Sequence, residues 1–385
     1  MSSATVSVTG LSHDGRGIAH REGKLIFVRG ALPGETVRII NTRQRARFDE
    51  AEVCDILHAS PDRQVPRCPH FGVCGGCDLQ HMSTSAQLAF KQKTVLELLK
   101  HHAHIQPVTC LPPLSDQIWG YRRKARLGVK YLQKKDKMLL GFREKNKHFI
   151  ADLQACHTLH PSVGQSLQTL AQLLYGLHIR AHIPQIEVAV GESCTALILR
   201  HLVPMPESDR EQLILFAKNA STPAGPQYLL YLESHKGIEP LYPTDPSRSL
   251  FYSASSSLRW FFEPQQFIQV HPTVNQHMIH QVCQLLDPRP SDRVLDLFCG
   301  IGNFTLPLAQ SSREVIGVEG CAQAVNQARK NATYNGFTSV SFFVENLDQT
   351  PFQGAWTHGP YDHLLLDPPR TGAAALIPRV GEWRP

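Results

Sequence analysis

The fold of this chain is decided by the stretch Arg293-Val-Leu-Asp-Leu-Phe-Cys-Gly-Ile-Gly-Asn-Phe-Thr-Leu-Pro-Leu308, which predicts a buried strand that turns sharply into a helix. Asp296 interrupts the apolar run, and Gly300 and Gly302 supply a permissive backbone at the turn. Because these glycines have no side chain, the main chain there can come within hydrogen-bond reach of a small molecule, with the amides of the next helix pointing at it. The stretch therefore predicts a ligand-binding turn.

The residues that follow predict three more strands, each with a polar residue at its carboxyl end. The strand Glu314–Glu319 ends in an acid 19 positions after Gly300, where a carboxylate can receive ribose hydroxyls in a doubly wound fold. A helix over 322–335 follows, then a strand leading to Asn346 and a last strand ending at Asp367. Four strand ends of this kind form a cofactor crevice.

Two classes of cofactor fit such a crevice. A nicotinamide dinucleotide requires a third glycine at the next turn of the helix, where this chain has Thr305. S-adenosylmethionine is the better match. The pattern Asp-x-Phe-x-Gly-x-Gly, followed by an acid, a polar residue and Asp-Pro-Pro at the next three strand ends, resembles the class I methyltransferases.

Length and composition limit the remaining organisation. A chain of 385 residues is expected to form two or three domains, and 39 Lys plus Arg against 33 Asp plus Glu give a net charge of +6. No signal peptide and no apolar run of about 18 residues is visible, so a soluble cytoplasmic protein with no membrane partner is expected. Ten cysteines in such a chain indicate thiols and a metal rather than disulfides.

Residues 1–58 are expected to form a small β-barrel, because four short β-like runs are separated by Gly-containing turn signals. Six cations give this segment a basic character suited to phosphates, namely Lys24, Arg29, Arg38, Arg43, Arg45 and Arg47. The runs at 13–17 and 30–35 resemble the TRAM domain, an RNA-binding barrel attached to RNA-modifying enzymes.

Three cysteines form a C-x5-C-x2-C motif at Cys68, Cys74 and Cys77. Neighbouring thiolates repel one another unless a cation neutralises them, and a four-sulfur site needs one more ligand. The candidates for that ligand, best first, are Cys156, Cys54 and Cys110. The spacing alone leaves both zinc and a [4Fe-4S] cluster open.

Residues 59–260 are expected to form an α+β middle domain. A helix is predicted from about Ser85 to His102, with a buried stripe formed by Leu88, Val95, Leu98 and Leu99. Between Tyr121 and Lys147 there are eleven Lys or Arg and two acids with aromatic residues interleaved, which is a footprint for nucleic acid. The segment Phe267–His271 is predicted to be a strand that opens the last domain, residues 261–385, with Gln269 facing the crevice.

Together these motifs resemble the ribosomal-RNA uracil-5 methyltransferases, and they are most similar to the RlmD group acting on 23S rRNA. The resemblance implies an α/β chain with an N-terminal TRAM-like (OB-like) barrel, a central α+β domain with an iron-sulfur cluster, and an incomplete, Rossmann-like class I methyltransferase domain. It implies 23S rRNA as the partner, with no obligate protein partner. It also implies a [4Fe-4S] cluster on Cys68, Cys74, Cys77 and Cys156, and S-adenosylmethionine held by Gln269, Phe298, Asn303, Glu319, Asn346 and Asp367.

In this family a cysteine thiolate adds to carbon 6 of uracil and so activates carbon 5 toward the sulfonium methyl, after the base has been flipped into a pocket. The family's nucleophile lies in a Ser-Cys-Asn-Pro motif after Asp-Pro-Pro-Arg, and the proton-abstracting Glu lies further on; neither occurs here. The chain is therefore expected to be C-terminally truncated, with no catalytic residue of its own. Two alternatives are an N-methyltransferase that uses Asp367-Pro-Pro on a base amine, and a non-catalytic RNA-binding iron-sulfur protein.

Overall fold

The computed structural model describes residues 3–221, 227–243, 249–254 and 258–383. The chain divides into two compact units, one made of Met1–Pro113 with Leu139–His157 and the other of Leu114–Met138 with Thr158–Pro385. Within the described ranges, no helix has both the length and the apolar character needed to cross a membrane. The three-domain division expected from the sequence stays a prediction.

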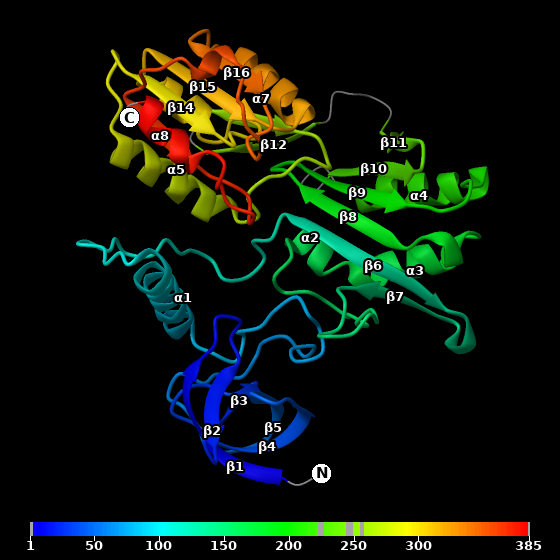
Figure 1. The fold of residues 1–385 in the computed structure, drawn as a ribbon. Coiled ribbons are helices and arrows are strands. Elements are labelled where there is room, and N and C mark those ends of the chain that lie inside the picture. The colour runs from blue at the N-terminus through cyan, green and yellow to red at the C-terminus, as the bar shows by residue number, and fades with distance from the viewer. Residues whose placement is uncertain (1–2, 222–226, 244–248, 255–257, 384–385) are drawn as a thin grey trace. The chain divides into compact units, whose positions relative to one another are not determined.

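The N-terminal residues form a closed barrel, as expected (Figure 1). Its strands are β1 (Ser3–Leu11), β2 (Gly17–Arg21), β3 (Lys24–Arg29), β4 (Thr36–Gln44) and β5 (Phe48–His58). They pair in the order β1-β2-β3-β5-β4, and β3 and β5 run parallel. Alternate side chains of each strand point inward, so small and branched apolar residues such as Val6, Val28 and Ile39 fill the barrel.

A buried carboxylate fastens the barrel to the chain that follows it. Glu35 is fully buried, and its two oxygens accept hydrogen bonds from Arg63 and from the backbone N–H groups of Leu32 and Ser60. Arg63 also donates to the carbonyl of Gly30 at 2.6 Å. These bonds hold the pKa of Glu35 below its ordinary value although burial opposes them, so the ion pair is kept at neutral pH.

The helix predicted after the cysteine motif is present, but its predicted buried stripe is wrong. Helix α1 (Thr84–Leu98) continues into a π-helical turn over Leu99–Ala103, and α1 contains no buried residue. The Val95 and Leu98 side chains are 55% and 50% exposed. Apolar residues occupy nearly successive positions at the end of this helix, so they spread around its surface instead of forming one face.

The second unit contains a six-stranded sheet in the order β11-β10-β9-β8-β6-β7, in which β9 and β10 are parallel. The strands are β6 (Lys124–Leu132), β7 (Lys137–Gly141, where the chain passes into the first unit), β8 (Gln185–Val190), β9 (Cys194–Arg200), β10 (Gln227–Ser234) and β11 (Gly237–Tyr242). Three helices accompany them, α2 (Pro161–Gly164), α3 (Leu167–Gly176) and α4 (Glu207–Ala220). This agrees with the α+β character expected from the sequence.

A short hairpin of β12 (Leu250–Ser253) and β13 (Arg259–Phe262) supports the strand-to-helix turn of the last domain. Trp260 on β13 is fully buried, stacks on Tyr252 with ring centroids 5.3 Å apart, and donates from Nε1 to the carbonyl of Gly302 at 2.8 Å. Leu306, Val325 and Phe342 belong to the same apolar cluster. The hairpin therefore fixes the turn from beneath, through packing and one buried hydrogen bond.

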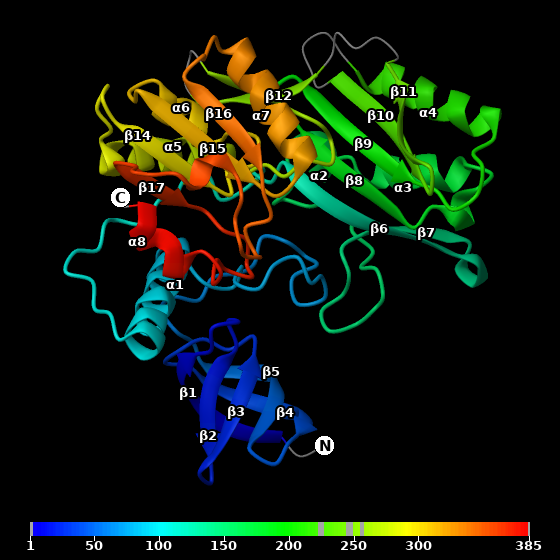
Figure 2. The ribbon, with the colours of Figure 1, turned by 45° about the horizontal axis from the view of Figure 1, so that its top comes forward.

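The last domain is a parallel four-stranded sheet in the order β16-β15-β14-β17 (Figure 2). Its strands are β14 (Arg293–Leu297), β15 (Glu314–Glu319), β16 (Val340–Val344) and β17 (His363–Leu366), and its helices are α5 (Pro272–Leu286), α6 (Thr305–Ala309), α7 (Ala322–Tyr334) and α8 (Val380–Trp383). The order reverses beside β14, so a crevice is expected at the carboxyl ends of β14 and β17. This confirms the doubly wound arrangement predicted from the sequence.

The segment Phe267–His271, predicted to be a strand, is irregular. Val270 accepts the N–H of Arg123, the residue before β6, at 3.0 Å. Pro264 and Pro272 flank the segment and lack the N–H that a strand ladder requires. His271 instead begins α5, since its Nδ1 accepts the N–H of Val274 at 3.3 Å.

Candidate functional site

The turn after β14 is built from three residues with left-handed backbone angles. Phe298 has φ of 66°, Gly300 of 57° and Gly302 of 87°. The N–H groups of Phe298 and Cys299 are both held by the carbonyl of Val318 on β15, at 2.9 and 3.1 Å. A non-glycine residue with positive φ is strained, and such strain persists where the surrounding structure fixes it. The turn thus presents its main chain at the sheet edge in one defined conformation.

Glu319, at the end of β15, tightens this turn. One carboxylate oxygen accepts the N–H of Gly300 at 3.1 Å, and the other accepts the N–H of Cys321 at 2.9 Å. The side chain therefore links the turn after β14 to the start of α7. Each carboxylate oxygen can accept more than one hydrogen bond, so the remaining lone pairs are available to ligand hydroxyls.

Asp296, the residue that interrupts β14, is fully buried beneath the turn. One of its oxygens accepts the hydroxyl of Thr305 at 2.6 Å, and the other has no hydrogen-bond partner among the described residues. Burial raises the pKa of Asp296 to about 7; the bond from Thr305 opposes this, whereas the nearby charges of Asp367 and Glu319 add to it. Asp296 thus titrates near neutrality.

A pocket of about 1370 Å³ opens at the carboxyl ends of these strands. This exceeds the several hundred cubic ångströms of a typical small-molecule site. Part of the wall comes from the strand ends and the turn, and part from aromatic residues of β10, β11 and β13. The lining includes Tyr231, Tyr242, Phe261, Phe267, Gln269, Phe298, Gly300, Ile301, Glu319, Cys321, Asp367 and Pro368.

Four of the six residues expected to hold the cofactor line this pocket, namely Gln269, Phe298, Glu319 and Asp367. Burial in the crevice raises the pKa of Asp367, although part of its side chain stays exposed. Asn303 is placed elsewhere: it exchanges two amide hydrogen bonds of 2.9 Å with Asn275 and accepts the hydroxyl of Tyr252 at 2.8 Å. Asn346 is exposed beyond the end of β16, where its side chain accepts the N–H of Asp348 at 3.0 Å.

Sequence reasoning missed the aromatic wall of the pocket. Phe267 is 74% exposed, although it is a large apolar residue, and it lies two residues before Gln269 at the pocket edge. Tyr231 lies on β10, within the predicted middle domain, and Phe261 lies on β13, a strand that the sequence did not predict. Phe267 carried a usable signal, since the nearby Pro264 and Pro272 disfavour a strand; the other two carried none.

The four cysteines expected to bind a cluster meet in the first unit. Burial raises the pKa of the Cys74 thiol, and the nearby Cys77, Cys156 and Cys68 raise it further. Gly76 donates its N–H to Cys74 Sγ at 3.4 Å. By contrast, the alternative ligands Cys54 and Cys110 are exposed, and Cys54 Sγ donates to the carbonyl of Arg38 on the barrel.

The loop that carries Cys74 packs closely on residues 139–157. A Cβ on Gly75 would lie 2.9 Å from the carbonyl of Arg143, and one on Gly76 would lie 3.3 Å from the Phe142 ring. Lys145 pairs with Asp78 at 2.8 Å. In the part of the chain that is described, however, no group of three or more His, Cys, Asp or Glu side chains has the arrangement of a metal-ion site.

The basic segment predicted to contact nucleic acid is partly occupied by internal contacts. Burial lowers the pKa of Arg123 and of Lys124, whose Nζ donates to the carbonyl of Pro264. Arg126 pairs with Glu187 at 2.7 Å. Its role in binding nucleic acid therefore stays a prediction for the remaining cations.

Two known families match parts of the chain. Residues 2–54 match the TRAM domain, and residues 252–350 match the family described as tRNA (Uracil-5-)-methyltransferase. Among solved structures, the chain is similar to the Pyrococcus abyssi tRNA (uracil-54, C5)-methyltransferase in complex with S-adenosyl-L-homocysteine, with a TM-score of 0.70 and 20% identity over 99% of this chain and 88% of that one. At this identity the likeness shows the fold alone.

Curated proteins are similar over nearly all of the chain. It is 44% identical over 379 residues, 97% of this chain and 84% of the relative, to the 23S rRNA (uracil(1939)-C(5))-methyltransferase RlmD of Xanthomonas campestris pv. campestris (strain 8004). It is 45% identical over 382 residues, 98% and 84%, to the protein of the same name from Nitrosococcus oceani. The expectation that the chain is truncated is not supported by these similarities.

Proposed function

The chain belongs to the RlmD family of 23S rRNA (uracil-C5)-methyltransferases, and on that premise we propose that it transfers the methyl group of S-adenosylmethionine to carbon 5 of a uridine in 23S rRNA. The relatives' names give position 1939 as the target, and we propose the same uridine and a cytoplasmic site of action here. The observation that carries the proposal is the glycine turn clamped by Glu319 at the edge of a large, partly aromatic pocket.

The pocket residues suit this cofactor. S-adenosylmethionine supplies an electrophilic methyl group on a cationic sulfonium. We assign Glu319 to its ribose hydroxyls, the turn at Phe298–Gly300 to close approach of its nucleoside, and Asp367 and Gln269 to its polar atoms near the methyl group. Asn303 and Asn346 remain proposed contacts from the resemblance; Asn303 would first have to give up its bonds to Asn275.

Methylation at carbon 5 of uracil needs a thiolate at carbon 6 and a base for the carbon 5 proton. Cys299 does not fit the thiolate role, because it is buried beneath the turn and burial raises its pKa well above the ordinary range. Burial also raises the pKa of Cys283. We therefore assign the thiolate role to neither Cys299 nor Cys283. The alternatives, amine methylation by Asp367-Pro-Pro and RNA binding without catalysis, are not favoured by the family membership.

Two independent experiments test the proposal, one on cofactor binding and one on methyl transfer. Calorimetry with S-adenosylmethionine should show one site, and Glu319→Ala should weaken binding at least tenfold, whereas Glu345→Ala, an acid beyond the pocket, should not. Incubation with unmodified 23S rRNA and labelled cofactor should then give 5-methyluridine. A methylated adenine or guanine, or no cofactor binding by the parent chain, would refute the proposal.

We also propose that Cys68, Cys74, Cys77 and Cys156 hold a [4Fe-4S] cluster. The support is the electrostatic coupling of these four thiols and the close packing of the glycine pair on residues 142–143. In a [4Fe-4S] cluster each of the four thiolates would bind its own iron. When bound, the cluster would cross-link 68–77 to 139–157.

Anaerobic reconstitution followed by iron and sulfide analysis tests the cluster. Cys77→Ser should abolish the charge-transfer absorbance, whereas Cys54→Ser and Cys110→Ser, which remove exposed thiols outside the group, should leave it unchanged. Zinc without sulfide in the purified protein would show that the group is a different metal site.

A further inference from the structure

The barrel's cations fall into two classes that the sequence does not distinguish. Residues 1–58 contain eight Lys or Arg and seven Asp or Glu, so the barrel as a whole is nearly neutral. Five of the cations lie on or beside strands β1–β4 and pair with acids of the barrel itself. The other three, Arg43, Arg45 and Arg47, lie at the end of β4 and in the loop that joins it to β5.

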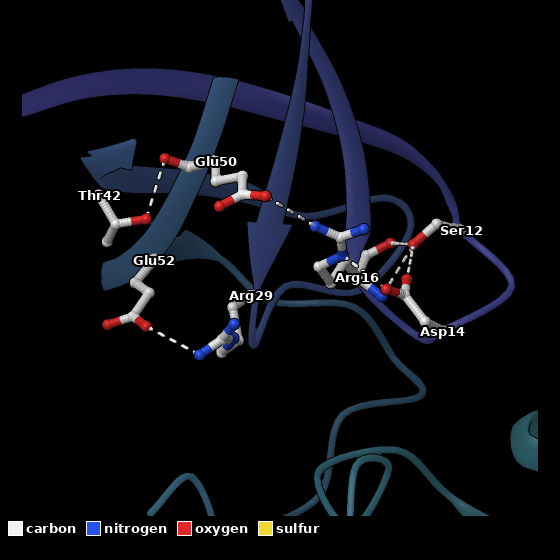
Figure 3. A network of polar contacts seen from close by, with 7 residues as sticks. All are labelled: Ser12, Asp14, Arg16, Arg29, Thr42, Glu50 and Glu52. Atoms are coloured by element: carbon white, nitrogen blue, oxygen red, sulfur yellow. Dashed lines mark hydrogen bonds and ion pairs between the residues drawn. The ribbon is translucent and has the colours of Figure 1, made fainter. Parts of the chain in front are cut away.

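The cations on the barrel wall are neutralised locally (Figure 3). Arg16 contacts Asp14 at 2.8 Å and Glu50 at 3.7 Å, and it also lies over the Phe27 ring with its Cζ 4.5 Å from the centroid. Arg29 contacts Glu52 at 3.3 Å. The remaining pairs are Lys24 with Asp49, Arg38 with Asp55 and Arg21 with Glu22. A phosphate would have to displace a carboxylate from each of them.

Arg43, Arg45 and Arg47, the hairpin arginines, differ from the cations of the barrel wall because the acids near them are already bound by other groups. All three are exposed, and the described residues include no carboxylate paired with their side chains. Asp49 is bound by Lys24 at 2.6 Å and accepts the backbone N–H of Arg45, while Glu50 faces Arg16. The loop itself is tight, since Arg45 N–H donates to the carbonyl of Phe48 at 3.0 Å. Three guanidinium groups with no carboxylate partner among the described residues are therefore carried by residues 43–47 of one hairpin.

We propose that the β4–β5 hairpin, through Arg43, Arg45 and Arg47, is the phosphate-binding surface of the barrel, and that the paired cations of the wall are not. The inference rests on the proposed function, in which the partner is RNA. Binding a phosphate releases a condensed counterion only when the cation contributes net charge, which an arginine already paired with a carboxylate does not. Guanidinium groups also bind phosphate bidentately, which favours arginine at such a surface.

The test is the salt dependence of binding between the full chain and unmodified 23S rRNA. Each phosphate contact on single-stranded nucleic acid contributes a slope of about −0.7 in log K against log salt. The triple variant Arg43→Gln, Arg45→Gln, Arg47→Gln should therefore reduce the magnitude of the slope by about 2. The ratio of the parent's affinity for RNA to that of the variant should then fall about 100-fold when the salt concentration rises tenfold. The triple lysine variant keeps three charges and should keep the parent slope.

A paired control separates net charge from location. Arg29→Gln with Glu52→Gln, combined with Arg38→Gln and Asp55→Asn, removes two complete ion pairs from the wall and should leave the slope unchanged. Equal melting temperatures would show that each variant is folded. If the triple glutamine variant showed the same salt dependence of RNA binding as the parent chain, the inference would be overturned and the proposed function would stand. Absence of RNA binding by the parent chain would overturn both.

Discussion

Replacing Asp296 by Asn should stabilise the second unit, and the gain should grow with pH. Asp296 is fully buried with one oxygen lacking a partner, and burial raises its pKa to about 7 from an ordinary value of about 3.9. The folded protein therefore holds this proton more tightly than the unfolded chain does. Its contribution to stability is fully present below about pH 4 and is lost as the pH rises toward 7.

The size of the effect follows from the shift. Each pKa unit corresponds to 1.36 kcal/mol, so ionising buried Asp296 costs the folded state about 4 kcal/mol at pH 8 relative to acid. Asn has the same shape, carries no charge, and can still pair with the hydroxyl of Thr305. Between pH 5 and pH 8, the free energy of unfolding of Asp296→Asn should rise relative to the parent by about 3 kcal/mol.

Urea unfolding followed by tryptophan fluorescence measures this, because Trp119, Trp260, Trp356 and Trp383, the four tryptophans of the chain, all lie in the second unit. Asp136→Asn is the control with the opposite sign. Hydrogen bonds from the Tyr131 and Tyr175 hydroxyls lower the pKa of Asp136, so its stabilising contribution is lost only in acid and should be constant from pH 5 to 8. The reasoning would be refuted if the difference in unfolding free energy between Asp296→Asn and the parent did not change from pH 5 to 8.

Three further results are expected. Glu35→Gln leaves Arg63, in the chain that follows the barrel, without its counter-ion and should cost about 3–5 kcal/mol of unfolding free energy, which calorimetry checks; a cost below 1 kcal/mol would show that the pair is replaceable. Trp383→Ala removes a ring that is 1% exposed and 5.5 Å from Trp356, and should cost about 3–5 kcal/mol in urea unfolding, whereas exposed Val344→Ala should stay within about 0.5 kcal/mol. At pH 7, binding of the sulfonium cofactor should lower the pKa of Asp296 and release protons, whereas binding of the uncharged thioether product should release fewer protons. Calorimetry in buffers of different ionisation enthalpy measures the number of protons released by each ligand. Equal proton release would contradict the assignment of the cofactor to this pocket.

The four strands of the last sheet could be predicted closely because their signals are local, whereas the predicted strand Phe267–His271 is irregular. Glu314–Glu319 is bounded by polar residues and contains only apolar residues and glycine between them, and the strand has these same limits in the structure. The turn at Gly300 and Gly302 was likewise expected, since positive φ angles favour glycine. Phe298 adopts a positive φ without such a signal, because hydrogen bonds to β15 impose it.

What could not be predicted depends on partners distant in sequence. The resemblance implied that Asn303 holds the cofactor, which stays a prediction; no local signal indicated that it pairs with Asn275 on α5. The same holds for the barrel, where the sequence shows six similar cations and only the fold shows which of them face an acid. The stripe on α1 failed for a different reason, since hydrophobic periodicity identifies a buried face only when the other faces are polar.

The charges around the pocket explain why this crevice selects a sulfonium donor over a dinucleotide. Negative charge at the end of the sheet comes from Glu319, Asp367 and the titrating Asp296. The charges of Glu319 and Asp367 add to the effect of burial in raising the pKa of Asp296, and burial raises the pKa of Asp367. The phosphates of a dinucleotide would be repelled there, and the turn has no third glycine to admit them. A cationic donor is attracted instead. After methyl transfer the product is an uncharged thioether, so the same carboxylates hold it less tightly than the substrate, which favours product release.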